Sequence, residues 1–110
     1  MAQFEIKDGV AIIPEGTKTI PSDAFKGCTE LINVVILDSV TEIGECVFEY
    51  CKNLKTITLP AGVDMIDESV FEGCDNIETI YVPAKKDDYY KKCLPEELHD
   101  NIVEISIDKK

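Results

Sequence analysis

A repeat of 23 residues constrains this chain more than any other feature of its sequence. Three consecutive units carry apolar residues and a cysteine at the same offsets. The positions in register are Phe25, Phe48 and Phe71; Cys28, Cys51 and Cys74; Leu31, Leu54 and Ile77; Val34, Ile57 and Ile80; Ile13, Ile36, Leu59 and Val82; and Ile20, Ile43 and Ile66. Because one such unit cannot bury its own apolar face, we expect successive units to stack as coils around a continuous core.

Each unit predicts two short extended segments and one tight turn. In the second unit, the alternation of Val34 and Ile36 indicates a strand with one inward face. Val40 and Ile43 point inward from a second extended piece, and the segment 47–51 is too short for more than a helical turn. Leucine and isoleucine at this period are typical of a leucine-rich repeat solenoid. The predicted fold is therefore mainly parallel β-structure with short helical turns.

The units resemble the BspA-like leucine-rich repeat family, whose pattern reads roughly LxxIxIPxxVxxIGxxAFxxC. The segment 54–74 shows this pattern most fully, and the resemblance covers residues 9–83. It implies a surface adhesion or protein-interaction module, of a kind often exported from bacteria or protists.

The two ends of the chain predict separate caps. Asp8-Gly9, between alternating apolar residues, indicates an N-terminal hairpin. Residues 84–94 read as a helix ended by Pro95, with a further short turn over 95–98. Val103 and Ile105 keep the repeat register with Ile80 and Val82. We expect one domain over 1–110, divided into a hairpin cap (1–12), repeats (13–83) and a helical cap (84–110).

Charge narrows the classes of partner. With 22 acidic and 11 basic residues the net charge is −11, which disfavours nucleic acid and anionic membranes and favours a basic partner. The alternative is that the acidic surface serves solubility alone. No apolar run reaches a membrane span, and the N-terminus does not resemble a secretory signal. The expected location is cytoplasmic, or the cell surface or outside if a leader was removed.

The sequence carries no pattern for catalysis, a metal or a cofactor. Its five cysteines cannot all pair, and we expect Cys28, Cys51 and Cys74 to be inward, free thiols. A disulfide between Cys28 and Cys51 is the alternative. There is no CxxC pair, no phosphate-binding glycine loop and a single histidine, His99. We therefore predict a protein that is not an enzyme.

The candidate binding residues follow from the strand alternation. If Val34 and Ile36 point inward, Val35 faces outward, in a column with Ile12, Thr58, Tyr81 and Glu104. The flanking columns are Asn33, Thr56 and Thr79, and Lys55 and Glu78. Solenoids bind partners on this concave strand face, and Tyr81 is the expected anchor. The alternative is that these residues are on the strands only because of their β-propensity and bind no partner.

The resulting hypothesis is a monomeric module that binds a protein or peptide on its concave face. The alternatives are an exported adhesin that attaches to host matrix or neighbouring cells, and a unit that self-associates through its sheet edges.

Overall fold

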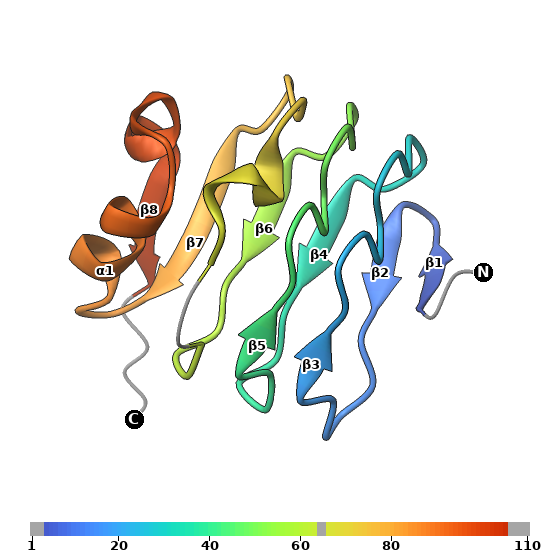
Figure 1. Ribbon diagram of the computed structural model, residues 1–110, viewed down its shortest axis with the longest axis horizontal. Coiled ribbons are helices and arrows are strands. Elements are labelled where there is room, and N and C mark those ends of the chain that lie inside the picture. The colour runs from blue at the N-terminus through green and yellow to red at the C-terminus, as the bar shows by residue number, and fades with distance from the viewer. Residues whose placement is uncertain (1–3, 64–65, 106–110) are drawn as a thin grey trace.

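The computed structural model describes residues 4–63 and 66–105, apart from the side chains of Glu68 and Asp87. Six strands form one sheet in the order β1-β2-β4-β6-β7-β8, and β3 pairs with β5 beside it (Figure 1). The large sheet contains β1 (Glu5–Lys7), β2 (Val10–Ile12), β4 (Asn33–Val35), β6 (Thr56–Thr58), β7 (Thr79–Pro83) and β8 (Ile102–Ile105). The other elements are β3 (Thr19–Ile20), β5 (Glu42–Ile43), α1 (Asp87–Cys93) and two 3₁₀ helices, η1 (Glu68–Phe71) and η2 (Glu96–Asn101).

The strands from β2 to β7 run parallel and pair at the repeat period. Val34 of β4 lies opposite Ile57 of β6, which lies opposite Ile80 of β7. All three are fully buried, because alternate residues of a strand point to the same face. In the smaller sheet Ile20 lies opposite Ile43, and both are buried. The repeat is therefore confirmed as stacked parallel strands of a leucine-rich repeat fold.

A column of phenylalanine rings fills the turns between the two sheets. The ring centroids of Phe25 and Phe48 lie 5.5 Å apart, and those of Phe48 and Phe71 lie 5.6 Å apart. Successive planes differ by only 5° and 10°, the parallel offset arrangement that aromatic rings favour. At most 4% of any of these three side chains is exposed. The predicted dry column is confirmed.

The predicted hairpin is present at the N-terminal edge. β1 pairs antiparallel with β2, and Lys7 lies opposite Val10. Asp8 and Gly9 between them have φ angles of 54° and 83°. Two successive positive φ angles define the tight turn whose twist matches that of the flanking strands. β1 thereby occupies the outer edge of β2.

Helix α1 packs against the third repeat unit. Tyr90 of α1 is fully buried, and its hydroxyl donates a hydrogen bond to the carbonyl oxygen of Pro60. The hydroxyl of Tyr89 donates to the carbonyl oxygen of Val63 over 2.9 Å. The helix predicted over 84–94 is thus confirmed with shorter bounds, and η2 follows Pro95.

The last strand departs from the predicted register by one residue. Val103 lies opposite Tyr81 and Glu104 opposite Val82, so the step from β7 to β8 is 22 residues. The sequence prediction, with Glu104 beside Tyr81 and Val103 and Ile105 at inward positions, is wrong. The physical reason is the connection. α1 and η2 replace the extended segment of an ordinary coil, so coil-to-coil backbone hydrogen bonds no longer fix its length.

Candidate interaction surface

Outward side chains of the five parallel strands line up across the sheet. We term this set the outward row: Ile12, Val35, Thr58, Tyr81 and Val103. Between 43% and 44% of each of the three aliphatic side chains is exposed, while Thr58 and Tyr81 are half-buried. The structure therefore brings Val35, Thr58 and Tyr81 together as predicted, and it places Val103 where Glu104 was expected.

The remaining predicted residues lie beside this row. A flanking row is formed by Asn33, Thr56 and Thr79, all half-buried and paired strand to strand. Lys55 and Glu78 are exposed where their strands begin. Backbone hydrogen bonds link them, because the Glu78 N–H donates to the Lys55 carbonyl oxygen over 2.8 Å. The six predicted residues that lie on the strands thus share the outward face, and Lys55 and Glu78 directly precede β6 and β7.

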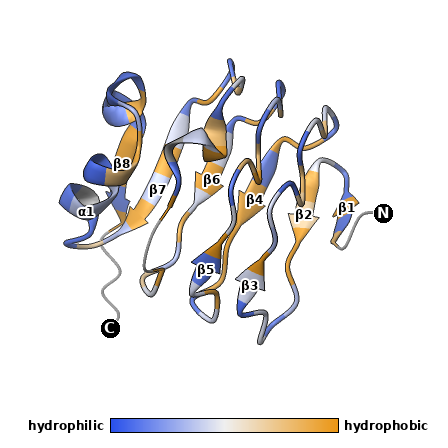
Figure 2. Ribbon diagram, in the orientation of Figure 1, coloured by the Kyte–Doolittle hydropathy of each residue, from blue (hydrophilic) through white to orange (hydrophobic). Residues whose placement is uncertain are grey.

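Four exposed aliphatic residues gather at β2 and β4, two of the strands that are coloured largely hydrophobic in Figure 2. We term them the apolar patch: Val10, Ile12, Ile32 and Val35, each 39–44% exposed. The Ile32 side chain lies over the hairpin turn, where a Cβ on Gly9 would come within 2.8 Å of its Cδ1 atom. Glycine at this position therefore permits the close approach.

The sequence reasoning missed two members of the patch, although a signal for each was present. Val10 stands two residues before Ile12, so the strand alternation places both on one face. Ile32 lies 23 residues before Lys55, at the same position of the preceding repeat unit, and the Lys55 N–H donates to the Ile32 carbonyl oxygen.

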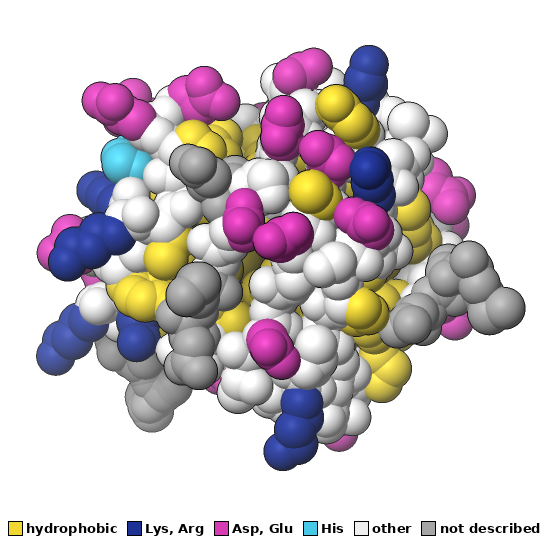
Figure 3. All heavy atoms as spheres, viewed as in Figure 1, with side chains coloured by type: hydrophobic (Ala, Val, Ile, Leu, Met, Phe, Trp, Pro, Cys, Tyr) yellow, Lys and Arg dark blue, Asp and Glu magenta, His cyan; other side chains and the backbone are white. Residues whose placement is uncertain are grey.

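Carboxylates outnumber lysines around the apolar patch. Glu5 lies opposite Ile12, and the other exposed acidic residues are within three positions of a patch residue along the chain. These carboxylates are Glu5, Asp8, Glu15, Glu30 and Asp38, against the lysines Lys7 and Lys55. Carboxylates are also spread over the side of the molecule shown in Figure 3, where several lysines gather at the end that carries α1. The field around the patch is therefore negative.

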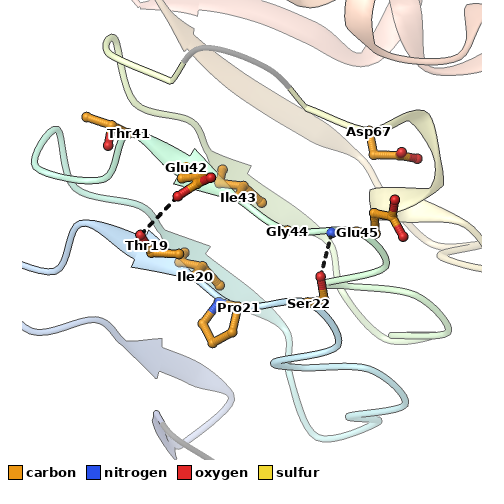
Figure 4. A pocket seen from close by; sticks show the side chains of 10 residues that line it. All are labelled: Thr19, Ile20, Pro21, Ser22, Thr41, Glu42, Ile43, Gly44, Glu45 and Asp67. Carbon is orange, nitrogen blue, oxygen red and sulfur yellow. Dashed lines mark hydrogen bonds between the residues drawn. The ribbon is translucent and has the colours of Figure 1, made fainter.

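A hollow runs beside β3 and β5 (Figure 4). Several of its polar groups have partners within the chain. The Thr19 hydroxyl donates to Glu42, and the Asp67 carboxylate accepts from the backbone N–H and hydroxyl of Ser69. These two hydrogen bonds lower the pKa of Asp67 below its usual value. Among the described residues no cluster of ligating side chains could hold a metal ion.

The repeat cysteines act as hydrogen-bond donors between coils. The Cys51 thiol donates to the carbonyl oxygen of Phe25 over 3.0 Å, and the Cys74 thiol to that of Phe48 over 2.9 Å. Both are buried, whereas Cys28 is half-buried, and all five cysteines are free. The interaction with the neighbouring Cys74 thiol, together with burial, raises the pKa of Cys51 far above its ordinary value. A thiol held protonated in this way is a poor nucleophile.

Comparison with known proteins places the chain in a family. It belongs to the BspA-type leucine-rich repeat family, because the family model for the BspA type leucine rich repeat region (6 copies) matches residues 8–110. The match thus extends beyond the residues 9–83 that carry the repeat pattern. No curated protein matches the chain.

Among solved structures, the chain is similar to a leucine-rich cell surface protein from Faecalibacterium prausnitzii. The two share 30% identity over 70% of this chain and 26% of that protein, with a TM-score of 0.49. The chain therefore spans about a quarter of that protein's length. None of the helices in the described part of the chain is long and apolar enough to cross a bilayer.

Proposed function

We propose that this protein is a non-catalytic module that binds another protein, or a peptide, on the strand face that carries the outward row. The observation behind this proposal is the row itself. Five parallel strands present three exposed aliphatic residues and a tyrosine on one side of one sheet. Aromatic and aliphatic side chains of this kind form the centres of protein interfaces. Leucine-rich repeat proteins generally serve protein interaction.

We propose further that the coils form a short solenoid whose strand face is concave. Hydrogen-bonded strands lie ~4.8 Å apart. Equivalent phenylalanine rings in the turns repeat at 5.5–5.6 Å instead. Coils that are closer together at the strands than at the turns curve the sheet toward its outward row, which supports a concave face.

The same solenoid would have both of its ends covered. β1 lies along the edge of β2, and the hydroxyls of Tyr89 and Tyr90 bind carbonyl oxygens of the third coil. These contacts support the division of one domain into a hairpin cap (1–12), repeats (13–83) and a helical cap (84–110).

The absence of catalysis is part of the proposal, and the roles of the reactive side chains support it. The Cys51 thiol bonds a carbonyl oxygen, and Nε2 of His99 lies 3.1 Å from the carbonyl oxygen of Leu94. A general base needs a reacting partner within hydrogen-bond reach, and this imidazole nitrogen is engaged with the backbone instead.

The test is capture of a partner that depends on the outward row. The immobilised chain is incubated with a lysate of the source organism, and the bound proteins are quantified by mass spectrometry. The double variant Tyr81→Ala/Val35→Glu should lose a partner that the wild type retains, with a purified-complex Kd weakened by about tenfold or more.

The matched control is Tyr50→Asn, which removes an exposed aromatic side chain that lies outside the row. Asparagine tolerates the φ angle of 62° found at this position. Capture should be unchanged in this variant. If the double variant folds and captures the same proteins as the wild type, the assignment of the strand face is wrong.

Family membership also supports a second function, adhesion at the cell surface. An exported adhesin would meet an oxidising environment, whereas the proposed cytoplasmic module would keep its thiols reduced. Five free thiols in the unreduced, unfolded protein from its native host would contradict the adhesin. A single mass in sedimentation at rising concentration would support the proposed monomer over edge-to-edge assembly.

A further inference from the structure

We infer that the partner presents an amphipathic α-helix, which lies along the outward row with lysine or arginine side chains beside the apolar patch. This inference depends on the proposed function and adds the chemistry of the partner to it.

The spacing of the outward row favours a helical partner. Its five positions lie on adjacent strands, so they repeat every ~4.8 Å and span ~19 Å. The apolar stripe of a helix advances ~5.5 Å for each contact, so four steps along it span ~22 Å. One face of an extended chain repeats every ~6.7 Å, so four steps span ~27 Å. Over the row a helix therefore drifts by ~3 Å, about half a position, whereas an extended peptide drifts by ~8 Å, more than one whole position.

The width of the apolar patch also fits a helix. Val10 and Ile12 point outward from the same strand, with Val35 beside Ile12 and Ile32 folded over Gly9. The patch is therefore two side chains deep at its N-terminal end. The apolar stripe of an amphipathic helix covers ~100° of its surface, which is wide enough to bury two such side chains side by side.

Charge favours a basic partner. Five exposed carboxylates lie opposite the patch or within three residues of it along the chain, against two lysines, and the whole chain has a net charge of −11. Lysine or arginine on the flanks of the docked helix would be attracted to this rim, and glutamate there would be repelled. The partner is therefore a basic amphipathic helix.

The experiment uses the full chain and a designed probe. The probe is a stapled, fluorescent helical peptide of about 16 residues, with leucine at every third or fourth position and lysine on the flanks. Three comparison peptides accompany it: a scrambled sequence, a version with glutamate for lysine, and an extended version interrupted by proline. Binding is measured by fluorescence anisotropy at low salt.

The probe should bind about tenfold more tightly than the scrambled or glutamate peptide. Ile12→Thr/Val35→Thr keeps the β-propensity of both positions and should weaken binding about fivefold or more, since it removes apolar area. Glu5→Gln/Glu15→Gln should weaken binding about twofold and reduce its dependence on salt. Tyr50→Asn is the control and should leave binding unchanged.

Two results would overturn the inference and separate it from the proposed function. Tighter binding of the extended peptide, with the same dependence on Ile12 and Val35, would refute the helix and leave the strand face as the binding surface. Equal binding of the probe and the scrambled peptide would also refute the helix. The proposed function would then depend on the capture experiment with Tyr81→Ala/Val35→Glu.

Discussion

Replacement of a single ring in the phenylalanine column measures how much the coils stabilise one another. Phe48 stacks on Phe25 on one side and on Phe71 on the other, at 5.5 and 5.6 Å. Among the described rings, Phe71 stacks on Phe48 alone. Each aromatic pair contributes ~0.5–1.5 kcal/mol beyond the area that it buries. Phe48→Leu should therefore cost about 1 kcal/mol more free energy of unfolding than Phe71→Leu, because it removes one additional pair.

Leucine is the right replacement because the domain has little stability to lose. A buried Phe→Ala change costs ~3–5 kcal/mol, close to the whole stability of many domains. Urea unfolding at 25 °C, followed by circular dichroism, gives the two free energies, and Phe71→Leu serves as the matched control. Equal losses, or a larger loss for Phe71→Leu, would refute the idea that the column transmits stability from coil to coil.

Two further predictions concern the C-terminal helix and the glycine turns. Tyr90→Phe should destabilise the protein by ~1–3 kcal/mol in urea unfolding, because it leaves the buried Pro60 carbonyl oxygen without its hydroxyl donor. Burial raises the pKa of Tyr90 above its ordinary value of 10.0. The folded state therefore holds this proton more tightly than the unfolded state, and stability should fall as the pH rises above about 10, less steeply in Tyr90→Phe. Gly73→Ala should cost more stability than Gly27→Ala, by about 1 kcal/mol or more. Both glycines have positive φ angles, 79° and 73°, but only at Gly73 would a Cβ collide with the ring of Tyr50. Equal thermal shifts for the two alanine variants would contradict this account.

Much of the fold could be predicted because the same pattern of apolar residues recurs in several units, and each unit folds in the same way. Phe25, Phe48 and Phe71 share one environment, so the inward position of any one of them implies that of the others. The hairpin was equally predictable, because Asp8 and Gly9 are the residue types that tolerate its positive φ angles.

The prediction was wrong where the repeat stops. Beyond Pro83 the local backbone hydrogen bonds of α1 and η2 replace the backbone bonds between coils, so the connection is not held at the repeat length and Val103 lies opposite Tyr81. The bonds from Tyr89 and Tyr90 to the third coil also join residues that no periodic pattern relates. Which carbonyl oxygens these hydroxyls reach depends on how α1 packs against the third coil, and no local sequence pattern predicts that packing.

The candidate site was predicted only in part, for a related reason. Strand alternation identified Val35 and Tyr81 as outward. It gave no measure of exposure, which decides where apolar surface gathers. Most of that surface lies over β2 and β4, where Ile32 folds over Gly9 and adds its side chain to the patch, while Val103 is the exposed aliphatic residue opposite Tyr81.

The most direct test of the proposed binding face is an NMR titration of the methyl-labelled protein with a captured partner. We expect shift changes to gather on the methyl groups of Ile12, Val35 and Val103, the exposed aliphatic members of the outward row. The methyl groups of Ile20 and Ile43, in the smaller sheet, should stay unchanged. Shift changes that gather on the smaller sheet, with the outward row unmoved by a saturating partner, would contradict the proposed binding face.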